Sequence, residues 1–141
     1  DVNALATAAL YHDASEILTG DLPTPIKYHN AEIMSAYHAV EDLAVQKLLG
    51  MLPPELRETY ADVLAEDKDG DIYPLVKAAD KLSAYIKCIE ERKAGNNEFL
   101  SAEAQTRAAL EASPLPEVQY FLEHFIPAFE RDLDELGAIG Q

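Results

Sequence analysis

The sequence predicts an all-α protein that folds as a single helical domain. Apolar residues recur at the three- and four-residue spacing of amphipathic helices in several long segments, and no segment has the alternation typical of a strand. The 141 residues are 48% hydrophobic and include only 6 glycines, which suits one domain with a sizeable core. No internal repeat or low-complexity linker divides the chain.

The first helix is expected over residues 2–12, which are rich in alanine and leucine. Its apolar stripe leads to His12, so this imidazole is expected at the end of a buried face. If the helix continues as far as Leu18, Glu16 follows His12 on the same face, because residues four apart are neighbours on a helix.

Further helices are expected over about residues 30–50, 53–66, 72–94, 99–112 and 117–136. Asn30 is expected to cap the first of these, and the proline at 54 to begin the second. Gly95 follows the third in the position where glycine ends helices. Pro127 is expected to kink the last helix rather than end it, because the apolar stripe continues on both sides.

Polar chemistry is concentrated in residues 11–25. This stretch combines one imidazole with three carboxylates, those of His12, Asp13, Glu16 and Asp21. An imidazole with hard carboxylate oxygens suits a divalent first-row metal that stays partly open to water. The two prolines at 23 and 25 are expected to hold the backbone extended, so that Asp21 and Thr24 lie in a loop beside the first helix.

The same residues also have simpler interpretations. A His-Asp pair is common at a capped or solvated helix end, and His12 could be a core histidine bonded to a backbone carbonyl. Glu16 could be a solvent-facing residue of a short helix. Spacing alone does not decide between these readings and a metal site.

Asp80 is an acidic residue far downstream of this stretch. In the helix of residues 72–94, the core face is expected to consist of Ile72, Leu75, Ala79, Leu82 and Ile86. Asp80 lies at the border of this face, where a carboxylate can reach an ion in a cleft. The alternative interpretation is that Asp80 forms an exposed ion pair with Lys77, which would contribute little to stability.

Together these residues resemble a known family. The His12-Asp13 pair after an apolar helix, with Asp80 far downstream, resembles the HD-domain metal phosphohydrolases. Residues 21–25 (Asp-Leu-Pro-Thr-Pro), 87–91 and 94–99 are similar to one branch, the bacterial HD-domain 5′-deoxynucleotidases, which remove phosphate from deoxynucleoside monophosphates. The similarity extends over nearly the whole chain and implies an HD-domain helical bundle over residues 1–141.

The resemblance also implies site residues. A divalent metal cation (cobalt, manganese or similar) is expected to be held by His12, Asp13 and Asp80. Glu16 is expected to position the attacking water as the catalytic residue. The substrate-binding residues are expected to be Asp13, Asp21, Leu22, Pro23, Thr24 and Asp80. Because two anions repel, Asp21 should contact a sugar hydroxyl rather than the phosphate.

One part of the family pattern is not found in this sequence. The family's metal site includes a histidine upstream of the His-Asp pair, and an Arg-Trp pair in the same region binds substrate. No histidine precedes His12, and the sequence has no tryptophan. We therefore expect the family's N-terminal segment to be missing before Asp1, and this chain to bind metal weakly and hydrolyse little.

Composition restricts the partners. The formal net charge of -15 argues against binding to a nucleic-acid backbone or an anionic membrane surface, and no apolar run approaches membrane-spanning length. The single cysteine, Cys88, cannot form an internal disulfide, which favours a reducing, cytoplasmic location. Broad apolar faces over residues 33–52 and 118–136 favour a homodimer.

Two other functions stay open. One is an HD-domain phosphohydrolase that acts on another nucleotide, such as a triphosphate or a cyclic species. The other is a non-catalytic acidic helical module that binds partners through its apolar faces. The coincidence of the site residues named above argues against the second. The sequence leaves open the metal, the base preference, deoxy versus ribo selectivity and the oligomeric state.

Overall fold

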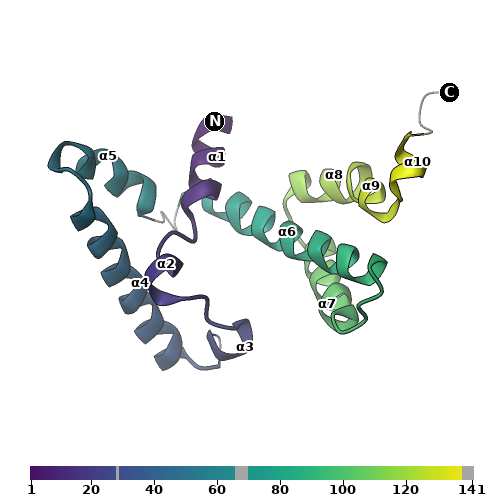
Figure 1. Cartoon of the computed structure of the whole chain (residues 1–141), viewed down its shortest axis with the longest axis horizontal. Coiled ribbons are helices and arrows are strands. Elements are labelled where there is room, and N and C mark those ends of the chain that lie inside the picture. The colour runs from purple at the N-terminus through teal and green to yellow at the C-terminus, as the bar shows by residue number, and fades with distance from the viewer. Residues whose placement is uncertain (28, 66–69, 138–141) are drawn as a thin grey trace. The chain divides into compact units, whose positions relative to one another are not determined.

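The computed structural model describes residues 1–27, 29–65 and 70–137 (Figure 1). Within these ranges the chain forms ten helices and no strand, which confirms the predicted all-α class. The chain divides into two compact units, Asp1–Val76 and Lys77–Gln141. No helix in the described ranges is both long and apolar enough to cross a membrane.

Helix α1 (Val2–Tyr11) begins at Asp1, whose carboxylate accepts a hydrogen bond of 2.8 Å from the backbone N–H of Asn3. The helix predicted over residues 2–12 is confirmed, but its continuation to residue 18 is wrong. A turn of residues 12–15 separates α1 from α2 (Glu16–Thr19). In this turn the N–H groups of Ala14 and Glu16 bond to carbonyls three residues earlier, so the helical i to i−4 ladder is interrupted.

Helix α3 (Thr24–Lys27) corrects the prediction of an extended backbone through both prolines. Pro25 stands in the first turn of this short helix, where its missing N–H has no intrahelical partner to lose. The N–H groups of Ile26 and Lys27 both bond to the carbonyl of Pro23, at 2.8 and 3.0 Å. Only residues 20–23 form the predicted loop.

Helix α4 (Ala31–Met51) begins as predicted, because the Asn30 side chain accepts a 2.8 Å hydrogen bond from the N–H of Ile33. Helix α5 (Pro54–Leu64) follows, with proline in its first turn. Helices α2, α3 and α5 all contact α4, and α1 contacts α5. The first unit is thereby assembled around α4.

Helix α6 (Tyr73–Lys93) starts in the first unit and continues without a break into the second. It ends as predicted at Gly95, whose φ of 87° lies in the left-handed region. The N–H of Asn96 donates a hydrogen bond to the carbonyl of Glu91, and the N–H of Gly95 donates one to the carbonyl of Arg92. These two hydrogen bonds together form a Schellman motif.

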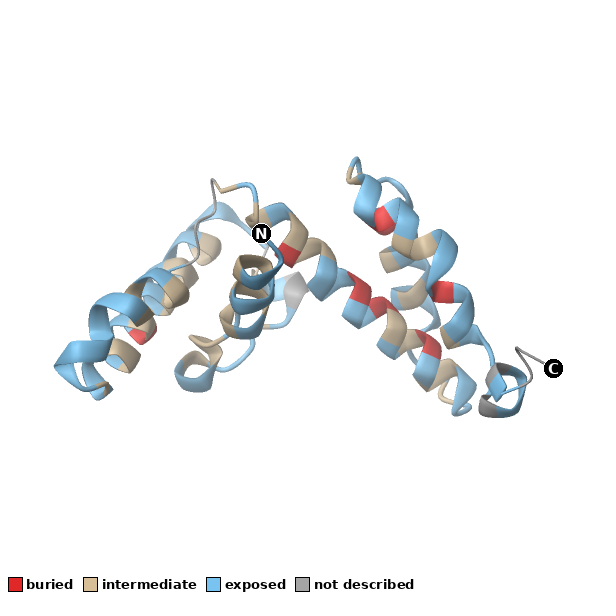
Figure 2. Ribbon diagram, turned by 90° about the horizontal axis from the view of Figure 1, so that it is seen from above, coloured by how far each residue is buried: buried red, intermediate tan, exposed pale blue. Residues whose placement is uncertain are grey.

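The predicted core face of α6 is partly wrong. Leu82 is buried as expected, but Ala79 is exposed, and the most deeply buried side chains of α6 are those of Tyr85 and Ile89. Figure 2 colours the buried positions of the ribbon red. Leu82, Tyr85 and Ile89 follow one another at three- and four-residue spacing, as on one face of a helix. The buried stripe is therefore rotated away from the one that the sequence pattern indicated.

The second unit also contains α7 (Leu100–Glu111), α8 (Pro116–His124), α9 (Ile126–Glu130) and α10 (Leu133–Gly137). Its core joins α6 to the helices that follow and consists of Leu82, Tyr85, Ile89, Leu110, Val118 and Ile126. The single kinked helix expected over residues 117–136 is wrong, because the chain interrupts the helix at Phe125. Pro127 has no N–H to continue the ladder, so α9 restarts with proline in its first turn.

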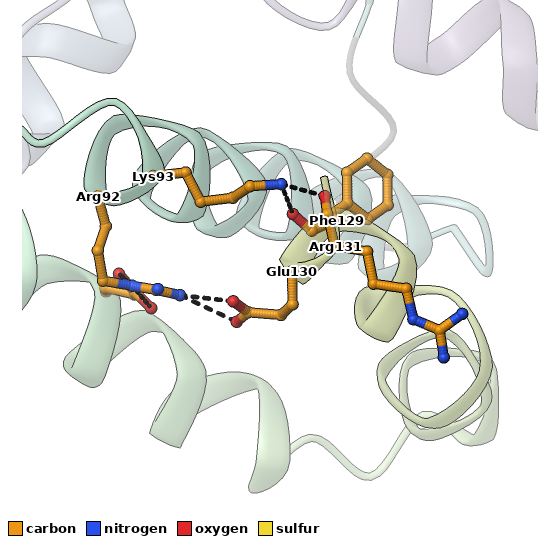
Figure 3. Close-up of polar contacts among 6 residues, drawn as sticks. Arg92, Lys93, Phe129, Glu130 and Arg131 are labelled. Carbon is orange, nitrogen blue, oxygen red and sulfur yellow. Dashed lines mark hydrogen bonds and ion pairs between the residues drawn. The ribbon is translucent and has the colours of Figure 1, made fainter. Parts of the chain in front are cut away.

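Arg92 and Lys93 connect α6 to the other helices of this unit (Figure 3). The Arg92 guanidinium donates to the carboxylates of Glu103 on α7, at 3.0 Å, and Glu130 on α9, at 2.7 Å. Both contacts raise the pKa of Arg92, and the contact with Glu103 has the larger effect. Lys93 donates to the backbone carbonyls of Phe129 and Arg131, at the end of α9. This end of α6 is thus fixed by hydrogen bonds to charged groups.

Candidate functional site

His12 follows the last residue of α1 and is held there by a local hydrogen bond. Its Nδ1 lies 2.8 Å from the backbone carbonyl oxygen of Ala9. A carbonyl oxygen can only accept, so Nδ1 carries the hydrogen and Nε2 is the ring atom that can bind a metal. The interpretation of His12 as a histidine bonded to a backbone carbonyl is therefore correct, and it is compatible with a metal site.

Asp13 presents its carboxylate to the same nitrogen. Its Oδ2 lies 3.0 Å from His12 Nε2, although the two residues are adjacent in the turn. The His12 side chain is 18% exposed and the Asp13 side chain 51% exposed, so a mostly buried, oriented imidazole stands beside an accessible carboxylate. An imidazole nitrogen and a carboxylate oxygen at this separation are a donor pair that suits a divalent first-row cation.

Glu16 begins α2 and so lies beyond the turn, rather than on the face of α1 where the sequence placed it. Burial raises the pKa of Glu16 above its usual value, and the negative charges of Asp13 and Asp21 raise it further. The ammonium of Lys27 lowers the same pKa, and Glu41 raises it. Glu16 therefore belongs to a group of charged side chains and retains a proton at higher pH than an ordinary glutamate.

The other predicted substrate-binding residues of this stretch lie between α2 and α3 or at the start of α3. Asp21 and Pro23 are exposed, and Leu22 is partly buried. Thr24 begins α3, and its side chain lies outside the described part of the structure. The charge of Asp21 acts on Glu16, so the structure brings these two carboxylates into one electrostatic environment.

A cavity of about 800 Å³ lies within the first unit. It is enclosed by α1, the end of α5 and the start of α6, and its lining includes His12, Tyr73 and Val76. Most of its lining surface is apolar, as in many sites that take small organic ligands. The imidazole of His12 thus stands at the border of a space that is large enough for a ligand.

Asp80 is an exposed residue of α6. It follows Val76 by four residues on a continuous helix, so the two side chains occupy neighbouring positions on one face. Val76 lines the cavity to which His12 contributes.

Sequence reasoning missed three residues around Glu16. Lys27, Tyr37 and Glu41 come from α3 and α4 and contact one another or the loop of residues 20–23. They belong to no motif, and their separations of 11 to 25 residues from Glu16 have no helical period. Only the packing of α2 and α3 against α4 brings them to this site.

Comparisons with known proteins identify the family of this chain. The family model described as 5′-deoxynucleotidase YfbR-like matches residues 1–129. The 5′-deoxynucleotidases YfbR of Shigella flexneri and Escherichia coli are each 52% identical over 140 residues, which cover 97% of this chain and 70% of theirs.

A solved structure is also similar. The HD-domain phosphohydrolase lin2634 of Listeria innocua aligns with a TM-score of 0.76 at 28% identity, and the alignment covers 92% of this chain and 64% of that one. The family model and the relatives independently confirm the resemblance read from the sequence. The chain belongs to the YfbR-like 5′-deoxynucleotidase family of HD-domain phosphohydrolases.

Proposed function

We propose that the protein is a metal-dependent 5′-deoxynucleotidase, which hydrolyses deoxyribonucleoside 5′-monophosphates to a deoxyribonucleoside and phosphate. Membership of the family and the names of relatives that are 52% identical support this activity. The observation that carries it is the His12-Asp13 pair, whose Nε2 and Oδ2 atoms lie 3.0 Å apart while Ala9 binds the other ring nitrogen. On this proposal residues 1–141 belong to one HD phosphohydrolase domain.

The metal would be held by His12, Asp13 and Asp80. These side chains supply one imidazole nitrogen and two carboxylate oxygens, a donor set that fits cobalt, manganese or a similar divalent ion. Membership of the HD-domain family, whose distal aspartate Asp80 matches in sequence, supports its inclusion. When bound, such an ion polarises a phosphate oxygen and offsets the negative charge of the substrate.

Glu16 would act as the catalytic residue. An ionised carboxylate accepts a proton from the attacking water as the water oxygen bonds to phosphorus and the bond from phosphorus to the 5′ oxygen breaks. The leaving 5′ oxygen takes up a proton to become the deoxyribonucleoside hydroxyl. The raised pKa of Glu16 supports this role, because it makes the carboxylate a better proton acceptor than an ordinary glutamate.

The nucleotide would contact the loop of residues 21–23 together with Thr24, Asp13 and Asp80. The exposure of Asp21 and Pro23 leaves this loop accessible to a ligand. Asp21 would accept a hydrogen bond from a sugar hydroxyl, since a carboxylate repels phosphate. These contacts would orient the ester bond toward Glu16.

The partner proposed for the protein is a second copy of itself. On α4 three large apolar side chains are about half exposed or more, at 50% for Val40, 56% for Leu43 and 69% for Met51. On α8 and the residue after it, Tyr120 and Phe125 are 59% and 49% exposed. Burying such surfaces in a homodimer would remove them from water. Sedimentation as a monomer at high concentration would contradict this.

A cytoplasmic location and the absence of nucleic-acid and membrane partners complete the proposal. The net charge of -15 disfavours both polyanionic surfaces. The single cysteine, Cys88, is partly buried, and burial raises the pKa of its thiol, so it is not poised for disulfide chemistry.

The experiment is a phosphate-release screen over nucleoside mono-, di- and triphosphates, in deoxy and ribo forms, with Co²⁺, Mn²⁺, Mg²⁺ or no added metal. We expect phosphate release from deoxyribonucleoside 5′-monophosphates in the presence of Co²⁺ or Mn²⁺, at a low rate because no histidine precedes His12 in this sequence, and none in chelator. If phosphate were released only from a different class of nucleotide, the protein would be an HD-domain phosphohydrolase with another substrate. No release from any nucleotide would favour a non-catalytic acidic module.

A further inference from the structure

Two residues of α4 contact the two ends of the segment 20–27. The Tyr37 hydroxyl donates a 2.9 Å hydrogen bond to the carbonyl oxygen of Gly20. The ammonium of Lys27 donates a 3.0 Å hydrogen bond to Oε1 of Glu41. Tyr37 and Glu41 are four residues apart and therefore lie on one face of α4. The segment is anchored at both ends to a single helix.

The anchors are connected to each other. The Lys27 ammonium lies 4.6 Å from the centroid of the Tyr37 ring, within the distance of a cation–π contact. Lys27 and Glu41 are only 20% and 19% exposed, so their ion pair is screened by water less than a surface pair is. We call Lys27, Tyr37 and Glu41 the α4 clamp.

The first anchor also reaches α2. The N–H of Gly20 bonds to the carbonyl of Glu16 at 2.9 Å, while its own carbonyl accepts from Tyr37. Gly20 has a φ of 71°, a conformation that residues with a side chain rarely adopt. The chain therefore turns sharply between Glu16 and the loop, and the Tyr37 hydroxyl binds the residue at that turn.

The middle of the segment has fewer constraints. Asp21 and Pro23 are exposed between the two anchors. A loop that is fixed at its ends and open in its middle keeps its geometry only while the anchors hold. Loosening either anchor adds conformations that a ligand must remove when it binds, and this weakens binding.

We propose that the α4 clamp consists of positioning residues, which hold the loop of residues 21–23 at a fixed place beside Glu16 and thereby set the affinity for the nucleotide. This inference rests on the proposed function, because it assigns the clamp to substrate binding. The clamp acts through the loop and touches neither substrate nor metal. Its loss should raise KM, while metal affinity, and kcat measured at a pH well above the pKa of Glu16, stay close to those of the unsubstituted protein.

The test compares Tyr37→Phe and Lys27→Met with the unsubstituted protein. Tyr37→Phe removes only the hydroxyl, and Lys27→Met removes the charge but keeps a side chain of similar length. Lys27→Arg is the conservative variant, because a guanidinium can still pair with Glu41 and lie over an aromatic ring. Tyr120→Phe and Lys87→Met are matched controls in the second unit, an exposed tyrosine and a lysine of an exposed ion pair.

Three measurements are made on every variant. They are KM and kcat for deoxyribonucleoside monophosphates, metal affinity by calorimetry, and the rate of hydrogen exchange at the backbone amides of residues 19–27. We expect KM to rise about three- to tenfold in Tyr37→Phe and Lys27→Met, the factor for losing about one hydrogen bond. The exchange of the Gly20, Ile26 and Lys27 amides should become faster. Lys27→Arg and both controls should remain near the unsubstituted values.

Faster exchange with unchanged KM would overturn the proposal, since the clamp would then only stabilise the fold. Unchanged exchange would also overturn it, because the anchors would not hold the loop. If the unsubstituted protein released no phosphate from any deoxyribonucleoside monophosphate, the proposed function would fail and take the substrate role with it. The exchange measurement would still decide whether the clamp holds the loop.

Discussion

The ring nitrogen Nδ1 of His12 lies 2.8 Å from the carbonyl oxygen of Ala9, one turn earlier in the chain. This contact assigns the hydrogen to Nδ1 and orients Nε2 toward the Oδ2 atom of Asp13. A backbone carbonyl of a regular helix thus performs the role that a carboxylate performs beside many metal-binding histidines. The imidazole is oriented whether or not a ligand is bound.

Replacing His12 with glutamine should weaken binding of Co²⁺ or Mn²⁺ by at least about ten- to a hundredfold, since even residues that only support a ligand contribute that much. Phosphate release should fall in parallel. The matched control is His124→Gln, which changes a half-exposed histidine of α8. Calorimetry with each metal measures the effect, and equal affinities in the two variants would exclude His12 as a ligand.

The pH dependence of kcat/KM should respond in opposite directions to Lys27→Met and Glu41→Gln. Lys27 lowers the pKa of Glu16 and Glu41 raises it, so losing Lys27 raises that pKa and losing Glu41 lowers it. Activity that needs ionised Glu16 is present above its pKa and lost as pH falls through it. The acid limb should therefore move to higher pH in Lys27→Met and to lower pH in Glu41→Gln.

Profiles recorded between pH 4 and 8 at saturating metal would show these shifts. A limb that moved in the same direction in both variants would indicate a general loosening of the site instead. If the acid limb moved in neither variant, a group other than Glu16 would control the pH dependence of kcat/KM. In Glu16→Gln, turnover should be low throughout, since an amide cannot accept the proton.

Replacing Arg92 with methionine should lower the melting temperature of the protein. Arg92 satisfies Glu103, whose side chain is only 15% exposed, and also Glu130, so its loss leaves a partly buried carboxylate without its guanidinium. Lys87→Met removes the exposed partner of an ion pair within α6, a lysine whose side chain is 66% exposed, and should change the melting temperature little. Thermal unfolding by circular dichroism compares them, and equal effects would count against the Arg92 network.

Leu110→Ala should destabilise the protein by about 2–5 kcal/mol, the usual cost of truncating a buried leucine. Leu110 is 1% exposed and belongs to the core of the second unit. Leu100 begins the same helix and is 47% exposed, so Leu100→Ala should cost much less. Urea unfolding of both variants measures the difference, and similar losses would show that Leu110 does not fill the core.

The sequence by itself determined most of the helices and the family to which the chain belongs. Asn30, Pro54 and Gly95 begin or end helices as predicted, because a cap, a first-turn proline and a left-handed glycine act through bonds to residues a few positions away. The His-Asp pair likewise needs only adjacent residues and the carbonyl of Ala9. Local chemistry of this kind can be read directly from a sequence.

Where a helix is interrupted was decided by the fold. The sequence predicted continuous helices through residues 12–15 and through Phe125, and both are broken. Helical periodicity persists across such breaks, because the apolar side chains on each side still find places in a core. The helix propensities of the residues are too weak to show whether a segment forms one kinked helix or two separate helices when packing favours two.

Only the tertiary structure decided which face of α6 is buried and what surrounds Glu16. The sequence placed Ala79 in the core, but the structure exposes it and buries Tyr85, whose large ring gains more by leaving water. Lys27 and Glu41 meet because α3 packs against α4. Such contacts depend on the joint packing of several helices, and no local pattern in the sequence encodes that packing.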